Sequence, residues 1–228
     1  MLVDIHSHND NNNKFQMFCF VVGKNSVGIH PWELSNKLDL IAIKERINKL
    51  KEKASPLVMA IGECGLDRRK KGLFLIEDQI KVLIWHLEWA LLIKKPIIIH
   101  CVHAHSDLLE ILKAKKYKGK ILLHDFSGNI LEAQAFLAYD CYFSFGHRLF
   151  HNNSKTSEVF KQLPTDKIFL ETDDQDKFTI EDLYQRAILL LKIDQKNLEI
   201  LFEKNLECFF SDLNNICSAD VIEDAGHT

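Results

Sequence analysis

Side chains that can bind metal ions stand at the ends of five separate apolar runs in this sequence. These side chains are His6, His8, Glu63, His100, His124 and Asp173. His6 and His8 close a run that begins with Leu2 and Val3. Successive side chains of a β-strand alternate between its faces, so these two imidazoles are expected on one face. The spacing therefore predicts two histidines side by side at a strand end.

The six side chains together have the chemistry of a metal centre. Imidazole suits zinc and other transition metals, and carboxylate also suits magnesium and manganese. Six ligands exceed what one catalytic zinc ion uses when a position stays open for water. Two divalent ions about 3.5–4 Å apart, sharing a bridging carboxylate, would use all six ligands and lower the pKa of bound water. The sequence thus predicts two divalent metal ions, with Zn, Mg and Mn as candidates.

Each of these residues also has a structural interpretation. An isolated His-x-His is commonly an ordinary surface pair, and a lone buried histidine is commonly a hydrogen-bonded core residue. Five strand ends carrying such residues by accident is a much rarer arrangement. The recurrence therefore favours the metal centre.

Eight apolar segments are strand candidates, and amphipathic helical segments lie between most of them. The strand candidates cover residues 1–8, 15–22, 27–30, 57–61, 96–100, 120–124, 141–145 and 167–170, of which 27–30 is the weakest. Helical segments begin near Ser35, Ile76, Ser106, Ile130, Ser154 and Thr179. Ser35 and Ser106 can cap their helices, and Thr179 with Asp182 three residues on forms an imperfect capping box. The helical spacing predicts an apolar stripe in the first of these helices, made of Leu38, Ile41, Ile43, Ile47 and Leu50. Strands that alternate with helices are typical of βα units and a parallel sheet.

An open doubly wound sheet and a closed TIM-type (β/α)8 barrel both fit this alternation. In a barrel all the parallel strands end on one face, where the active sites of such barrels lie. The six candidate ligands would then meet at one mouth, whereas an open sheet would spread them along an edge. The positions of the ligands therefore favour the α/β barrel.

Composition sets the broad class of the protein. The 228 residues are 46% hydrophobic and 27% charged, which is ordinary for a globular domain. We expect one barrel domain over residues 1–220 and a disordered tail over 221–228. The net charge of −3 argues against a large nonspecific nucleic-acid surface. The six cysteines form no Cys-x-x-Cys, and neither a signal peptide nor a membrane span is recognisable. A cytoplasmic protein without a stable protein partner is expected.

Several segments resemble the TatD-related metal-dependent hydrolases of the amidohydrolase-like barrels. The segments that carry the resemblance are Asp4-Ile-His-Ser-His8, Gly28-Ile-His-Pro31, Gly62-Glu-Cys-Gly-Leu-Asp67, Pro96-Ile-Ile-Ile-His100, His124-Asp-Phe-Ser-Gly128, Glu171-Thr-Asp173 and Asn205-Leu-Glu-Cys-Phe-Phe210. The resemblance covers nearly the whole chain, in the family's order. It implies a (β/α)8 barrel with two divalent ions and a phosphodiesterase activity, often of the exonuclease type.

The resemblance also implies roles for the candidate ligands. His6, His8 and Asp173 would hold one ion, and Glu63 would bridge to a second ion held with His100 and His124. Asp173 and Glu63 are the implied catalytic residues, since Asp173 could also hydrogen-bond the attacking water. Asp4 and Glu171 would support the ligands or form a structural salt bridge.

Three departures from the family concern the loops. Residues 9–29, between His8 and His30, are too few for two complete βα units, which predicts a barrel shortened or distorted near its second and third strands. The family's arginine shortly after His100 is missing, and His103 stands nearby. The segment after Asp173 lacks the usual proline-containing loop. These loops are expected to face the substrate, so the resemblance predicts the metal site better than it predicts the substrate.

Four further residues are candidates for substrate binding. They are His30, Trp32, Arg68 and Arg148. Arginine suits phosphate because its guanidinium donates two parallel hydrogen bonds, although a solvated surface arginine is equally ordinary. Trp32 could stack on a base or pack on the barrel rim.

These features together predict a divalent-metal-dependent hydrolase that cleaves phosphodiester bonds at DNA ends, or a small phosphate ester. Two alternatives stay open at this point. One is an amidohydrolase acting on a small cyclic amide or lactone. The other is an inactive metal-binding protein.

Overall fold

The structure of the chain is a computed structural model that describes residues 1–9, 17–34, 39–53, 58–69, 75–151, 154–175 and 177–211. Four predictions lie outside these residues. They are the strand start at Phe15, the helix start at Ser35, the strand start at Leu57 and the disordered tail 221–228. No helix within the described ranges is long and apolar enough to cross a membrane.

The described residues form eight parallel-paired strands, as the apolar segments predict. They are β1 Leu2–Ser7, β2 Met17–Val21, β3 Ser26–Val27, β4 Ala60–Asp67, β5 Ile97–Val102, β6 Ile121–Leu123, β7 Cys141–Phe145 and β8 Ile168–Leu170. Strands β3 to β8 form one sheet in chain order, and β1 pairs with β2. Every strand pair in these two sheets is parallel.

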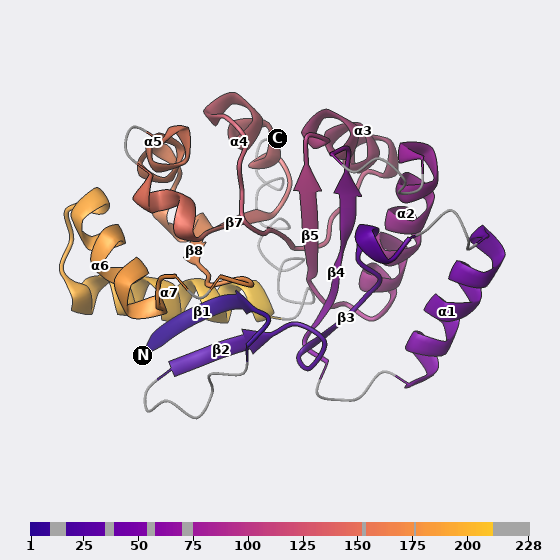
Figure 1. Cartoon of the computed structure of the whole chain (residues 1–228), viewed down its shortest axis with the longest axis horizontal. Helices are drawn as coiled ribbons and strands as arrows, with labels where there is room; N and C mark the ends of the chain where they lie inside the picture. Colours follow the sequence, from indigo (N-terminus) through magenta and orange to yellow (C-terminus); the bar gives the residue numbers. More distant parts are fainter. Residues whose placement is uncertain are drawn as a thin grey trace, which may run out of the picture.

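Helices follow most strands and lie outside the curved layer of strands (Figure 1). They are α1 Leu40–Lys53, α2 Ile76–Leu92, α3 His105–Lys115, α4 Ile130–Phe136, α5 Lys155–Gln162, α6 Ile180–Leu191 and α7 Gln195–Phe210. The predicted capping box at Thr179 is present, since the Thr179 hydroxyl accepts from the Asp182 N–H and the Asp182 carboxylate accepts from the Thr179 N–H. Ser106 does not cap α3, because the helix already includes His105 and its capping residue is Ala104.

The layer of strands closes between β8 and β1. Ser7 forms a parallel bridge with Asp173, and the Asp173 N–H donates to the His6 carbonyl at 2.9 Å. Beneath this seam, the buried Asp4 carboxylate accepts hydrogen bonds from the backbone and hydroxyl of Thr172 at 3.1 and 2.7 Å. The α/β barrel prediction is therefore confirmed at this seam.

The barrel is interrupted between β2 and β3, as the short stretch between His8 and His30 predicts. Parallel neighbours need a crossover of a dozen or more residues, but only residues 22–25 connect β2 to β3. The chain therefore passes directly from one sheet to the other, and no hydrogen-bonded ladder joins β2 to β3 within the part of the chain that the structure describes. Of the predicted strand 27–30 only Val27 lies in a strand, β3, which also includes Ser26, and Pro31–Glu33 forms a short 3₁₀ helix.

The core between strands and helices is apolar and buried. Ile43 and Ile47 of α1 are buried as their helical spacing predicts, but Ile41 is 71% exposed and does not belong to the buried stripe. The buried Asn205 side chain of α7 donates to the carbonyls of Thr165 and Ile168 at 2.8 and 3.0 Å. It thereby fixes the start of β8, the strand that leads to Asp173.

Candidate metal centre

Glu63 lies at the centre of a cluster of histidines at the carboxyl ends of the strands. Its side chain is buried, and one oxygen, Oε2, faces the two histidines of β1. His6 Nε2 is 3.4 Å from Oε2 and His8 Nε2 is 3.7 Å from it. The same two nitrogens lie 3.5 and 3.4 Å from Asp173 Oδ1. Two imidazoles and two carboxylates thus surround one point, as the parity of His6 and His8 predicts.

The other oxygen of Glu63, Oε1, faces three more imidazoles. The Nε2 atom of His124 is 2.8 Å away, His100 Nδ1 is 3.1 Å away, and His30 Nε2 is 3.1 Å away. Two oxygens of one carboxylate therefore point into two different sets of nitrogen atoms. This is the arrangement that a bridging carboxylate between two cations requires.

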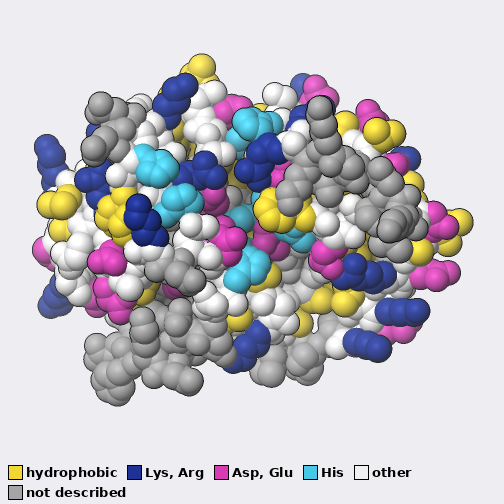
Figure 2. All heavy atoms as spheres, viewed as in Figure 1, with side chains coloured by type: hydrophobic (Ala, Val, Ile, Leu, Met, Phe, Trp, Pro, Cys, Tyr) yellow, Lys and Arg dark blue, Asp and Glu magenta, His cyan; other side chains and the backbone are white. Residues whose placement is uncertain are grey.

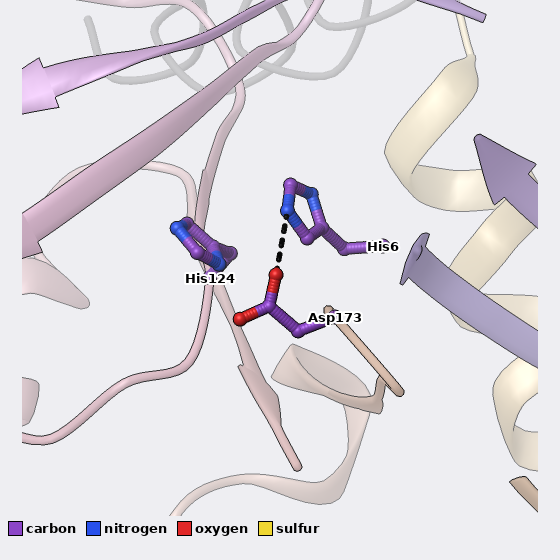
Figure 3. A group of neighbouring side chains, drawn as sticks. All are labelled: His6, His124 and Asp173. Carbon is purple, nitrogen blue, oxygen red and sulfur yellow. Dashed lines mark ion pairs between the residues drawn. The ribbon is translucent and has the colours of Figure 1, made fainter. Parts of the chain in front are cut away.

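The sequence-predicted ligands therefore all meet at this centre. Figure 3 shows one oxygen of the Asp173 carboxylate facing the His6 ring, with His124 beside them, and the rings of His6 and His124 are stacked with centroids 4.3 Å apart. Ligand atoms of His6, His124 and Asp173 lie within 4.8 Å of one another, and the same holds for His6, His8 and Glu63. Figure 2 shows histidine side chains at the middle of this face, with acidic and basic side chains beside them.

Several nitrogen atoms of the cluster have no suitable partner in the protein itself. Neither ring nitrogen of the buried His6 makes a hydrogen bond with a residue that the structure describes. His100 Nδ1 and His124 Nε2 approach each other to 3.1 Å while both face the same carboxylate oxygen. Buried polar atoms are normally paired, and ring nitrogens that converge in this way suit a shared cation. The donor set and its unpaired atoms therefore fit divalent metal ions.

His30 differs from the other imidazoles in the state of its ring. Its Nδ1 accepts a hydrogen bond from the Trp32 N–H at 3.1 Å, which caps the short helix Pro31–Glu33. A neutral imidazole has one donor and one acceptor nitrogen, so Nε2 carries the hydrogen and donates to Glu63. His30 is therefore a hydrogen-bond donor at the centre, although its Nε2 atom lies close enough to group with Glu63 and His100.

The electrostatics of the cluster keep its carboxylates ionised. Burial opposes the charge on Glu63, but the nearby His124, together with hydrogen bonds from His100, His124 and His30, holds the pKa of Glu63 well below its usual range. Burial also opposes the charge on Asp173, and the imidazoles of His6 and His8, 3.5 and 3.4 Å from its Oδ1, lower its pKa. Hydrogen bonds to Asp173 and Glu63 raise the pKa of His8 to about 10.

A second layer of carboxylates orients two of the imidazoles. His100 Nε2 is 3.1 Å from Asp67 Oδ2, which leaves Nδ1 to face Glu63. His124 Nδ1 is 3.7 Å from Glu171 Oε1, which leaves Nε2 to face Glu63. Such carboxylate–histidine pairs orient ligands and raise their basicity. The sequence-based prediction included Glu171 but gave Asp67 no role, although Asp67 follows Glu63 by four residues and a strand repeats its faces every two.

Asp67 connects the cluster to one aromatic side chain and one basic side chain. Trp32 Nε1 donates to Asp67 Oδ2 at 2.8 Å, and the Arg69 guanidinium pairs with the same carboxylate at 3.0 Å. The Trp32 ring is 45% exposed and meets the His30 and His100 rings edge-on. Trp32 therefore packs against site residues, as predicted for the rim, and still leaves part of its ring exposed to the solvent.

Two cavities adjoin the cluster. The first, of about 550 Å³, opens in front of Glu63 and is also lined by His30, Trp32, His100 and Asp173. The second, of about 660 Å³, is polar and is lined by Arg68, Arg69 and Arg148 among others. His100 and Trp32 of the first cavity and Arg69 of the second all bind Asp67, so the two cavities are neighbours.

Arg68 and Arg148 do not reach the first cavity. Arg68 forms a double hydrogen bond with Asp107 at 2.7 and 2.8 Å. Arg148 holds Asp125 with its Nε and one Nη atom at 2.8–3.0 Å. Each guanidinium uses one edge on its carboxylate and keeps further donors for the second cavity. The sequence could not predict these pairings, because both acidic partners follow other strands.

Comparison with known proteins gives one family. Residues 3–189 match the family described as TatD related DNase. An uncharacterised metal-dependent hydrolase of Buchnera aphidicola is 32% identical over 153 residues, which are 65% of this chain and 54% of that protein. The 3′-5′ ssDNA/RNA exonuclease TatD of Escherichia coli is 30% identical over 152 residues, with 65% of this chain and 56% of that protein covered. The chain thus matches little more than half the length of these relatives.

A crystal structure of a TatD homologue from Escherichia coli K12 has a similar fold. It superposes with a TM-score of 0.69 and 22% sequence identity, covering 87% of this chain and 78% of that structure. The similarity therefore holds for the fold, including the barrel arrangement of strands and helices.

Proposed function

We propose, since the chain belongs to the TatD related DNase family, that it is a divalent-metal-dependent hydrolase that cleaves phosphodiester bonds at the ends of nucleic acid strands. The observation that supports this most directly is Glu63, whose two carboxylate oxygens face two different sets of imidazoles. Relatives named as metal-dependent hydrolases and as a single-stranded DNA and RNA exonuclease support the same reaction class.

We further propose which residues hold the ions. His6, His8 and Asp173 with Glu63 Oε2 would hold one divalent ion, and His100 and His124 with Glu63 Oε1 would hold a second. When bound, such ions lower the pKa of a water molecule and polarise a phosphoryl oxygen. Zinc, magnesium and manganese all remain candidates for this mixed nitrogen and oxygen set.

The protein's own groups would supply orientation and proton transfer. Asp173 keeps its charge because its pKa is low, so its carboxylate is available to accept a hydrogen bond from the attacking water. The Nε2–H of His30 donates to Glu63 Oε1 and would hold this carboxylate in place between the two ions. Asp67 and Glu171 would hold His100 and His124 in the orientation that this arrangement needs.

Substrate binding would extend over both cavities. The free guanidinium donors of Arg68 and Arg148 in the second cavity suit phosphates of a strand that leaves the first cavity. A base could stack on the exposed ring of Trp32. The chain's net charge of −3 gives no broad positive surface for a long duplex, which favours single-stranded or frayed ends.

The test compares two labelled DNAs, one single-stranded with a free 3′ end and one a closed duplex. We expect stepwise loss of nucleotides from the first and little cleavage of the second. A chelator and the substitution Asp173→Asn should each abolish the activity. Failure to cleave either DNA with Mg²⁺, Mn²⁺ or Zn²⁺, in protein shown to carry metal, would contradict the proposal. Internal cuts in the closed duplex would contradict action at ends.

The cyclic amide or lactone alternative receives no support from the described cavity lining. A lysine between the ions would favour that chemistry, but no lysine lines the first cavity among the residues that the structure describes. The same nuclease assay separates an active enzyme from an inactive metal-binding protein.

A further inference from the structure

The first cavity continues from the metal centre into the interruption between β2 and β3. Val22 and Gly23 line it on the β2 side, and Ser26 and Val27 line it on the β3 side. Leu50 of the outer helix α1 lines the same cavity. We call this part, lined by these five residues, the side arm. In a barrel with a complete wall, a ladder between the second and third strands would occupy this space.

The side arm runs deep beside β4. Ser26 is the register partner of Ala60, and Val27 is that of Ile61. Ala60 precedes Glu63 by three residues, and a parallel strand rises about 3.3 Å per residue. The side arm therefore reaches about 10 Å below the level of the candidate metal centre. A group attached to a ligand at Glu63 would extend into the side arm, because both belong to one cavity.

The walls of the side arm are apolar apart from one hydroxyl. Val22, Val27 and Leu50 supply hydrocarbon surface, and a Cβ atom at Gly23 would meet nothing within 4 Å. Ser26 is 1% exposed, and its Oγ makes no hydrogen bond with any residue that the structure describes. A buried unpaired hydroxyl is unfavourable, so a ligand with a polar edge at this depth would be stabilised by it.

We propose that the side arm binds the unpaired terminal base of the nucleic acid strand whose phosphodiester lies at the metal centre. This inference rests on the proposed function and names how the strand end is recognised. A nucleobase has two apolar faces and polar groups along its edges, so its faces match the apolar walls and one edge group can pair with the Ser26 hydroxyl. No arginine or lysine lines the side arm among the described residues, so a phosphate would find no counter-charge there.

The same geometry accounts for selection of single strands. A base inside a duplex is stacked and paired, and removing it from the duplex costs free energy that a free end does not require. Glu63 and the side-arm residues line one cavity, so a base in the side arm would lie beside a phosphodiester at the metal centre. The chemistry at the metal centre is then limited to the bond nearest the inserted end.

The experiment measures kcat/KM for two labelled single-stranded oligonucleotides that differ only in their 3′-terminal residue. One ends in thymidine and the other in an abasic tetrahydrofuran, which keeps the phosphodiester and lacks the base. Burial or stacking of one base is worth about a tenfold change or more. We expect the native metal-loaded protein to cleave the thymidine end about 10-fold more efficiently or better.

Two substitutions fill the side arm from opposite sides. Ser26→Leu acts from β3 and Leu50→Trp acts from α1, so the second remains informative if the first fails to fold by circular dichroism. Each should bring the ratio of the two kcat/KM values close to one. Leu189→Trp is the matched control, since Leu189 is 70% exposed on α6 and away from the side arm. It should keep the ratio of the native protein.

Each outcome bears on a different statement. Equal cleavage of both oligonucleotides by the native protein would overturn the side-arm proposal and leave the hydrolase intact. A preference that survives in both filled variants would also overturn it, because the base would then bind elsewhere. Cleavage of neither oligonucleotide by metal-loaded protein would overturn the proposed function instead.

Discussion

The buried His86 of α2 should make the stability of the protein depend on pH between about 4 and 6.5. Its Nδ1 donates to the Val82 carbonyl at 2.8 Å, and its Nε2 accepts from the Ile29 N–H at 3.1 Å. Both nitrogens of the neutral ring are therefore used, and burial lowers the pKa of His86 to about 4. Protonation would turn the acceptor into a second donor facing Ile29, directly beside His30.

The sign and size of the effect follow from the pKa values of the two states. The ordinary histidine value is 6.5, so between pH 6.5 and 4 the unfolded chain binds a proton that the folded chain does not. The stability from neutral His86 is fully present above pH 6.5 and is lost as the pH falls toward 4. The difference of 2.5 pKa units corresponds to about 3 kcal/mol at most, of which roughly 2–3 kcal/mol is lost between pH 7 and pH 4.5.

The assay is urea unfolding of chelator-treated protein at pH 7 and at pH 4.5, for the native chain and two variants. His86→Gln keeps a side-chain acceptor for the Ile29 N–H without titrating, and His86→Leu removes the acceptor as well. Both variants should lose about 2–3 kcal/mol less than the native chain on acidification, because the proton no longer distinguishes the two states. At pH 7 His86→Leu should also be destabilised by about 1–3 kcal/mol, because the Ile29 N–H is left unpaired.

Comparison with an exposed position guards against a general effect of removing a histidine. His151 is exposed, so the variant His151→Gln should lose as much stability between pH 7 and pH 4.5 as the native chain does. If His86→Gln lost as much stability on acidification as the native chain does, the reasoning about this buried ring would be refuted.

Three further predictions concern the metal centre and its support. Glu63→Ala should remove metal from both positions and His6→Ala mainly from one, measured as bound metal per protein after dialysis; full occupancy in Glu63→Ala would contradict a shared carboxylate. Asp67→Asn should weaken metal binding on the His100 side about 10- to 100-fold in a competition titration with a chelator, because it removes the charge that orients the ring, and an unchanged affinity would exclude that role. Asn205→Leu should destabilise the fold by about 1–3 kcal/mol in urea unfolding, because the carbonyls of Thr165 and of the buried Ile168 lose their donor; a change below about 0.5 kcal/mol would show that water replaces it.

Much of the candidate site could be predicted from the sequence, because parallel strands end on one face. His100 and His124 each follow a short run of apolar residues, so the sequence predicts both their strands and the face that they share. The parity of His6 and His8 was equally informative, since a strand alternates strictly. The capping box at Thr179 was predicted from local spacing alone, because all its partners lie within one turn of helix.

The remaining features depend on contacts between distant segments. The hydrogen on His30 Nε2 is set by the Trp32 N–H, which requires the 3₁₀ helix Pro31–Glu33 that follows the predicted strand 27–30. Pairing of Arg148 with Asp125 joins the ends of two different strands, and no local pattern encodes it. The interruption of the barrel was predictable from the short stretch 9–29, but the side arm that it leaves required the register of β3 on β4.

The seam between β1 and the segment after β8 has a consequence for protein synthesis. Asp4 and Thr172 are 168 positions apart, and their hydrogen bonds join the two segments that carry His6 and Asp173. Contacts of such large sequence separation form late, since closing a long loop costs chain entropy before the contact is gained. While a ribosome is still translating the middle of the chain, His6 and His8 have no Asp173 to complete their set. The set of candidate ligands around His6 is therefore expected to stay incomplete until β8 has emerged and the barrel can close.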